Sequence, residues 1–240
     1  AILRTCGLGI VGALEAGRAL CGSEYIARMD GDDLSMEGRI AAQVDALDQD
    51  PTLAAVGAQV EVFPTPGEGL RRYVAWQNAL LSARDHADAL FIESPLCHPS
   101  VTLRAMAVEA VGGYREGDFP EDYDLWLRLA AQGFSLAKVS PTLFRWRDRE
   151  ARLTFTDPRY TRAAFRRLKA SHLAARLAHE KSFAIWGAGP TGRRLASSLR
   201  EHGAWPSAFI DIDPLKVGNT KRGGARVHPP SMLDDEPRPF

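Results

Sequence analysis

The chain has 240 residues, 45% hydrophobic and 25% charged, a composition typical of a globular protein. Thirty basic and thirty acidic side chains give a net charge of zero, so no overall field favours nucleic acid as a partner. There is no membrane-length apolar run and no signal-peptide pattern, and three widely spaced cysteines predict reduced thiols in a cytoplasmic protein.

The first segment contains a glycine pattern. Residues 7–12 fit GxGxxG, and Asp30 ends the next predicted strand, which is the outline of a dinucleotide fingerprint. The strand before it, residues 1–5, is short and carries an arginine, so we interpret residues 9–20 as a packing helix instead. Because the chain starts at Ala1 in what resembles the interior of a fold, we expect a fragment.

A short predicted strand over residues 25–29 runs into three acids, Asp30, Asp32 and Asp33. Carboxylates placed this close repel one another, and a bound Mg²⁺ or Mn²⁺ would remove that cost. If the strand pleat continues, Asp30 and Asp32 point to the same side, and Gly31 leaves room for a ligand. A solvated turn at a helix N-terminus is the alternative interpretation.

The middle of the chain alternates helical and strand patterns. Apolar spacing and stop signals predict helices over residues 36–47, 73–81 and 105–111, and strands over residues 53–62 and 100–103. Ser35 is the expected N-cap of the first of these helices. A further helix begins near Glu121, with Asp122 beside it. Acids there favour the helix dipole by ~0.3–1 kcal/mol, yet two acidic clusters in one α/β domain favour a shared site.

Taken in order, these motifs resemble glycosyltransferase family 2 over roughly residues 7–154. The resemblance is carried by Gly-Leu-Gly-Ile from residue 7, Glu24 to Asp33, Arg39 with Gln43, Val56-Gly57, His98-Pro99-Ser100, Gly112-Gly113-Tyr114, Glu121 to Trp126 and Arg145-Trp146-Arg147. It implies a GT-A fold and an inverting enzyme. Such an enzyme moves a sugar from a nucleotide-diphosphate sugar to an acceptor hydroxyl on a saccharide or lipid-linked acceptor, and the usual setting is cell-surface polysaccharide synthesis.

The resemblance also implies roles for the acids. Asp30 and Asp32 match the DxD element, with Asp32 as the ligand of Mg²⁺ or Mn²⁺, Asp30 against the ribose or sugar, and Asp33 supporting either. Asp122 matches the general base that takes the acceptor's proton, and Glu121 would orient it or bind the acceptor. Trp126 suits an acceptor pocket, but a tryptophan between two leucines is more often core, and His98 is given no role.

Two departures from the family pattern are visible. Family members usually begin with a strand and loop that grip the nucleotide base, which this chain lacks upstream of Ala1. After Trp146-Arg147, where the family often has a metal-binding histidine, this chain has Arg149. An arginine cannot ligate a cation but can hold a donor phosphate.

The C-terminal part has a different character. Residues 157–181 form a basic amphipathic helix, which we interpret as a linker, with peripheral contact to an anionic membrane as the alternative. In residues 182–240, Gly187, Gly189 and Gly192 fit GxGxxG between two predicted strands, and Asp211 ends the second. This pattern is similar to Rossmann-like modules that bind dinucleotides, and a purely structural turn is the alternative.

The sequence therefore predicts an α/β protein with three parts. Residues 1–156 form a GT-A domain that lacks its first strand, residues 157–181 a linker helix, and residues 182–240 a partial Rossmann-like module. Two rival functions remain open at this point. One is an NAD(P)-dependent oxidoreductase built on the C-terminal glycines, and the other is a non-catalytic nucleotide-binding fragment.

Overall fold

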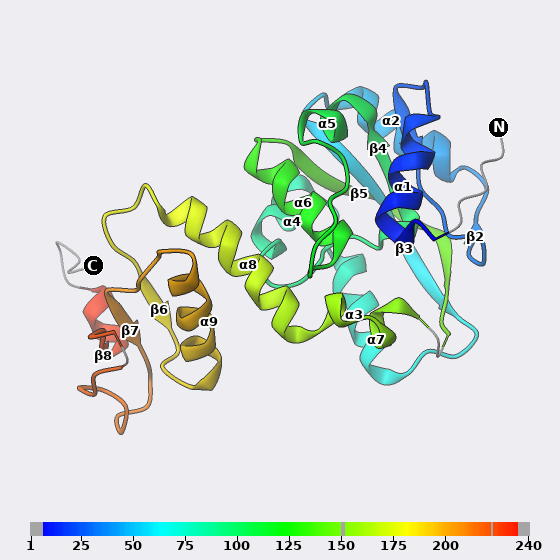
Figure 1. The fold of residues 1–240 in the computed structure, drawn as a ribbon. Helices are drawn as coiled ribbons and strands as arrows, with labels where there is room; N and C mark the ends of the chain where they lie inside the picture. The colour runs from blue at the N-terminus through cyan, green and yellow to red at the C-terminus, as the bar shows by residue number, and fades with distance from the viewer. Residues whose placement is uncertain (1–6, 150–151, 222, 235–240) are drawn as a thin grey trace. The chain divides into compact units, whose positions relative to one another are not determined.

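The computed structural model divides the chain into two compact units, Ala1–Thr161 and Arg162–Phe240 (Figure 1). The residues that it describes are 7–149, 152–221 and 223–234. Each unit contains a β-sheet and several helices, which confirms the predicted α/β class. The predicted strand over residues 1–5 lies outside the described residues. Among the helices described, none combines the length and the hydropathy that crossing a membrane requires.

The first unit is built on a five-stranded sheet in the order β1-β4-β3-β5-β2. Its strands are β1 (Tyr25–Ala27), β2 (Leu34–Ser35), β3 (Leu53–Phe63), β4 (Thr102–Arg104) and β5 (Ser135–Arg147). β3 and β5 run parallel, and the other neighbouring strands are antiparallel. β3 lies at the centre of the sheet, and its apolar run is nearly continuous because both of its faces are buried.

Helices and short 3₁₀ turns surround this sheet. The helices are α1 (Gly9–Ala19), α2 (Arg39–Gln49), α3 (Glu68–Ala79), α4 (Ala83–Ala89), α5 (Ala105–Ala110), α6 (Glu121–Ala131) and α7 (Leu153–Thr156), and the 3₁₀ turns are His98–Ser100 and Pro158–Tyr160. The predicted helices are present with shifted ends. The N-cap of α2 is Gly38, so the prediction for Ser35 is wrong, because Ser35 pairs with β5 as part of β2.

The second unit is a three-stranded parallel sheet with two helices. α8 (Arg162–Leu177) precedes β6 (Ala184–Trp186), α9 (Pro190–Glu201), β7 (Ala208–Ile210) and β8 (Arg226–His228), and a 3₁₀ turn follows at Pro230–Leu233. Ala170 and Ala174 of α8 are buried with Leu199, Phe209 and Val227 in one core. α8 therefore packs as part of this unit, whereas the sequence analysis treated it as a separate linker.

Candidate active site

Asp33 anchors the acidic loop that follows β1. Its carboxylate accepts a hydrogen bond from the backbone N–H of Arg147 at 2.7 Å, which ties the loop to the end of β5. The other carboxylate oxygen is buried and has no hydrogen-bond partner among the described residues. Burial raises the pKa of Asp33 to about 6, and the charges of Asp30 and Asp32 add to the shift. Asp33 is therefore held inside the loop while its two neighbours face outward.

The two outward acids are each paired with an arginine. Asp30 lies 2.8 Å from the guanidinium of Arg28, and Asp32 lies 2.7 Å from that of Arg149. The side chain of Asp30 is 45% exposed and that of Asp32 is 27% exposed, so both remain open to a ligand. Arg149, predicted to contact the donor, thus meets the acid predicted to bind the metal.

The acidic loop fits a divalent cation only in one way. Within the described part of the chain, no group of three or more His, Cys, Asp or Glu side chains is placed to hold a metal ion. Mg²⁺ usually keeps few protein ligands, often one or two carboxylates, and takes substrate phosphates as the rest. The exposed carboxylate of Asp32 meets that requirement, and a diphosphate would have to complete the site. Metal binding by Asp32 stays a prediction.

The second acidic cluster lies in the first turn of α6, where the helix holds two of its three acids in internal contacts. Glu121 is 2% exposed and accepts a hydrogen bond from the hydroxyl of Tyr160 at 2.6 Å. Asp124 is fully buried and pairs with Arg115 at 2.6 Å and Arg128 at 2.7 Å. Removing one partner of the buried Asp124 pairs is costly, so Asp124 is structural, whereas the role predicted for Glu121 stays a prediction.

Asp122 differs from both neighbours. It is only partly buried, and its carboxylate accepts backbone N–H groups at the start of α6 without a side-chain partner among the described residues. Burial raises the pKa of Asp122 above its usual range, and the nearby charge of Glu121 raises it further. A carboxylate with a raised pKa and no side-chain partner is suited to accept a proton.

Arg28 connects the two clusters. Its positive charge lowers the pKa of Asp33 in the loop and also that of Asp122 on α6. Its side chain is 11% exposed, and its Nη1 atom is buried with no hydrogen-bond partner among the described residues. One guanidinium therefore lies close to both acidic groups, as expected if they line one site. The sequence analysis quoted Arg28 in a motif and gave it no role.

The N-terminal part of the chain matches a family model. Residues 1–112 match Glycosyl transferase family 2. This first part of the chain belongs to glycosyltransferase family 2. The expected resemblance is thereby confirmed over residues 1–112, which include the acidic loop after β1 but not α6. The first unit, which contains these residues, is called the family 2 domain below.

Curated proteins similar to this domain are themselves glycosyltransferases. A glycosyltransferase of Haemophilus influenzae is 33% identical over 135 residues, 56% of this chain and 49% of its own length. The amylovoran biosynthesis glycosyltransferase AmsE of Erwinia amylovora is 32% identical over 141 residues, 58% of this chain and 51% of its own. The UDP-Gal:alpha-D-GlcNAc-diphosphoundecaprenol beta-1,3-galactosyltransferase of Escherichia coli is 29% identical over 128 residues, 52% and 44% respectively. The chain spans about half the length of these relatives.

Behind the α6 acids, the family 2 domain has a buried aromatic layer. His98 contacts the hydroxyl of Tyr114 through Nε2 at 2.8 Å, and its Nδ1 lies 3.7 Å from Glu121. Burial keeps the pKa of His98 well below its usual value, so the ring is neutral. Trp126 packs edge-on against His98 and is fully buried. Trp126 is therefore a core residue, and the neutral ring of His98 lies beside Glu121 in the same buried layer.

The glycine turn of the second unit follows the predicted pattern closely. Gly187 has a φ of +102°, and a Cβ on Gly192 would lie 1.8 Å from the carbonyl oxygen of Gly187. Asp211 accepts a hydrogen bond from the N–H of Ala188 at 2.8 Å and pairs with Lys216 at 3.2 Å. The backbone N–H groups of Asp213 and Ala188 lower the pKa of Asp211. Its carboxylate therefore already accepts hydrogen bonds from the backbone on both sides of the turn. Dinucleotide binding by these glycines and by Asp211 remains a prediction.

Proposed function

We propose that the family 2 domain transfers a sugar, with inversion, from a nucleotide-diphosphate sugar to an acceptor hydroxyl in cell-surface polysaccharide synthesis. The observation that carries the proposal is the family match over residues 1–112, together with an acid on α6, Asp122, that has no side-chain partner among the described residues. The relatives named for amylovoran biosynthesis and for a diphosphoundecaprenol-linked sugar support this setting. The expected cytoplasmic location, with the inner face of the membrane for a lipid-linked acceptor, belongs to the same proposal.

Asp122 is the proposed base. It takes the proton of the acceptor hydroxyl while that oxygen attacks the anomeric carbon, and the bond between this carbon and the donor diphosphate breaks. Arg28 partly offsets the effect of burial, because its charge lowers the pKa that burial raises. Glu121 is already held by Tyr160, so it orients the start of α6 and has no part in proton transfer.

Asp30, Asp32 and Asp33 are proposed to bind the donor. Asp32 would hold Mg²⁺ or Mn²⁺, which would supply positive charge to neutralise the leaving group. Asp30 faces the ribose or sugar. Asp33 keeps the loop attached to β5 through the Arg147 N–H. Arg149 gives up its contact with Asp32 to hold a donor phosphate bidentately.

The test is a transfer assay on the purified chain with a panel of UDP- and GDP-sugars, Mn²⁺, and a diphosphate-lipid-linked sugar as acceptor. Asp122→Asn keeps the shape and removes the basicity, so we expect turnover to fall by roughly 10²–10⁴-fold with donor affinity nearly unchanged. Glu121→Gln should do less. Asp118→Asn, an exposed acid just before α6, is the matched control and should leave turnover unchanged. Equal turnover in wild type and Asp122→Asn would refute the assignment of the base.

A further inference from the structure

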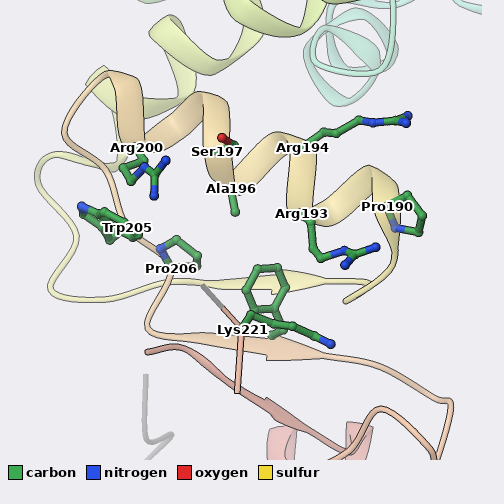
Figure 2. A pocket seen from close by; sticks show the side chains of 10 residues that line it. Pro190, Arg193, Arg194, Ala196, Ser197, Arg200, Trp205, Pro206 and Lys221 are labelled. Atoms are coloured by element: carbon green, nitrogen blue, oxygen red, sulfur yellow. The ribbon is translucent and has the colours of Figure 1, made fainter. Parts of the chain in front are cut away.

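The second unit contains a cavity that neither the glycine turn nor the family 2 domain accounts for. Its volume is about 420 Å³, which lies in the range of small-molecule sites. Figure 2 shows it beside α9, with Arg193 and Arg200 extending from the helix, and with Trp205, Pro206 and Lys221 contributed by the following segments. None of Gly187, Gly189 or Asp211 lines it, although Pro190 of the same turn does, so the cavity adjoins the fingerprint turn without including its glycines.

The lining is cationic without a counterion. It contains Arg193, Arg194, Arg200 and Lys221 and no acidic residue. No side-chain hydrogen bond or ion pair joins these four groups to any other described residue. Figure 2 shows Arg194 projecting away from the strands, while Arg193 and Lys221 extend to the same side of the unit. Like charges around one hollow repel one another, and an anion in the hollow would relieve that repulsion.

The rest of the lining is apolar and held in place. Ala196, Pro206 and Phe209 contribute apolar surface. The Trp205 ring is fixed between two neighbours: the Arg200 guanidinium lies 5.0 Å from its centroid, and a Cβ on Gly223 would lie 2.2 Å from the ring. Gly223 has a φ of +98°, so both its conformation and its lack of a side chain suit this packing. The hollow thus combines an apolar wall with a cationic rim.

We propose that this cavity binds a diphosphate ester. The diphosphate would lie against Arg193 and Lys221, where guanidinium and ammonium groups form charge-assisted hydrogen bonds to phosphate oxygens. The apolar or aromatic remainder of the ester would lie along Pro206 and Trp205. Both a nucleoside diphosphate and a prenyl diphosphate have this chemistry, and the size of the cavity admits either.

The experiment measures binding to the full chain by titration calorimetry with pyrophosphate, UDP and farnesyl diphosphate as separate probes. Buffers without divalent metal and an Asp32→Ala background keep the proposed donor site from contributing. We expect pyrophosphate to bind, the affinity to fall with added salt, and Arg193→Gln/Lys221→Gln to lower it at least tenfold. Arg176→Gln, an exposed cation on α8, is the matched control and should change nothing.

The outcomes separate the alternatives. Stronger binding of UDP than of pyrophosphate assigns a nucleotide, and stronger binding of farnesyl diphosphate assigns a lipid diphosphate. Absence of binding at millimolar concentration overturns the proposal. So does an unchanged affinity in the double variant, or a loss caused only by Gly189→Val, which would place the anion on the glycine turn. Circular dichroism of the double variant, whose changes are on side chains at a cavity rim, checks that the unit still folds.

Discussion

Gly192→Ala tests whether the turn between β6 and α9 is set by space alone. The added Cβ would lie 1.8 Å from the Gly187 carbonyl oxygen and 3.0 Å from its carbon. Real Cβ atoms stay beyond about 3 Å of such neighbours, so the backbone of the turn and the first turn of α9 must separate by more than about 1 Å. Gly192 lacks a positive φ, so strain in its own backbone adds nothing.

The expected cost is large for so small a unit. Overpacking of a rigid site typically costs about 1–3 kcal/mol, and a backbone neighbour that cannot rotate away places this change at about 3 kcal/mol or more. A unit of roughly 80 residues has a total stability of about 4–12 kcal/mol. We therefore expect the unfolding transition of the second unit to fall by about 12 °C or more, because each kcal/mol shifts Tm by about 4–8 °C.

Differential scanning calorimetry with fluorescence of Trp186 and Trp205 follows the second unit. The matched control is Gly189→Ala at the N-cap of α9. A Cβ there would meet nothing within 4 Å, and φ is −75°. That change should cost at most about 1 kcal/mol, since alanine is a weaker N-cap than glycine. If Gly192→Ala unfolds at the wild-type temperature, or if Gly189→Ala destabilises as strongly, then close packing of the turn is not what requires the glycine.

Three further changes test the site, the turn and the core. Asp32→Ala should lose Mn²⁺-dependent binding of UDP while the fold survives, and calorimetry showing unchanged affinity would rule out this carboxylate as the metal contact. Gly189→Val should block dinucleotide binding by filling the space that a pyrophosphate needs; if the wild type binds no dinucleotide at millimolar concentration, the glycines form a structural turn only. His86 is buried, and burial lowers its pKa to about 4. The unfolded chain therefore takes up a proton between about pH 6.5 and 4 that the folded chain refuses, so the free energy of unfolding should fall by up to about 3 kcal/mol across that window. His86→Gln should remove the part of this dependence that His86 causes, while buried His98 keeps its own part, and urea titrations at pH 7 and 4.5 that show equal losses in both proteins would contradict the prediction.

Local sequence patterns predicted the elements that are buried along most of their length. β3 is apolar along its length because it is covered on both faces, and α6 repeats apolar residues because nearly the whole helix is buried. β5 was not predicted as a strand, although its last three residues were named as a family motif, because Pro141 interrupts its pattern. In the structure, two consecutive residues of β3 pair with Val139 and then with Thr142 of β5, so Pro141 falls in a bulge of β5 where no ladder hydrogen bond is needed.

The sequence did not predict one short helix or the contacts between segments that lie far apart in the chain. α4 is a seven-residue helix with too little apolar periodicity to detect, although the Ser82–Asp85 capping box was a usable local signal. The different surroundings of Glu121, Asp122 and Asp124 were even harder to predict from the sequence. Tyr160 holds the first and lies 39 residues away, while Arg115 and Arg128 hold the third from nine and four residues away. Neighbouring acids come to differ in burial, partners and pKa only through contacts that other segments of the fold make with them.

The chemistry of Asp122 depends on two opposing effects on one carboxylate. Burial and Glu121 favour the protonated form, while Arg28 favours the ionised form that a base needs. Arg28 also acts on Asp33, so its charge is shared between the loop expected to bind the donor and the acid expected to receive the proton. A negatively charged donor arriving at the loop would compete for Arg28 and weaken its hold on Asp122. The pKa of Asp122 would then rise when the donor binds, which strengthens the carboxylate as a proton acceptor and at the same time lowers the fraction of it that is ionised.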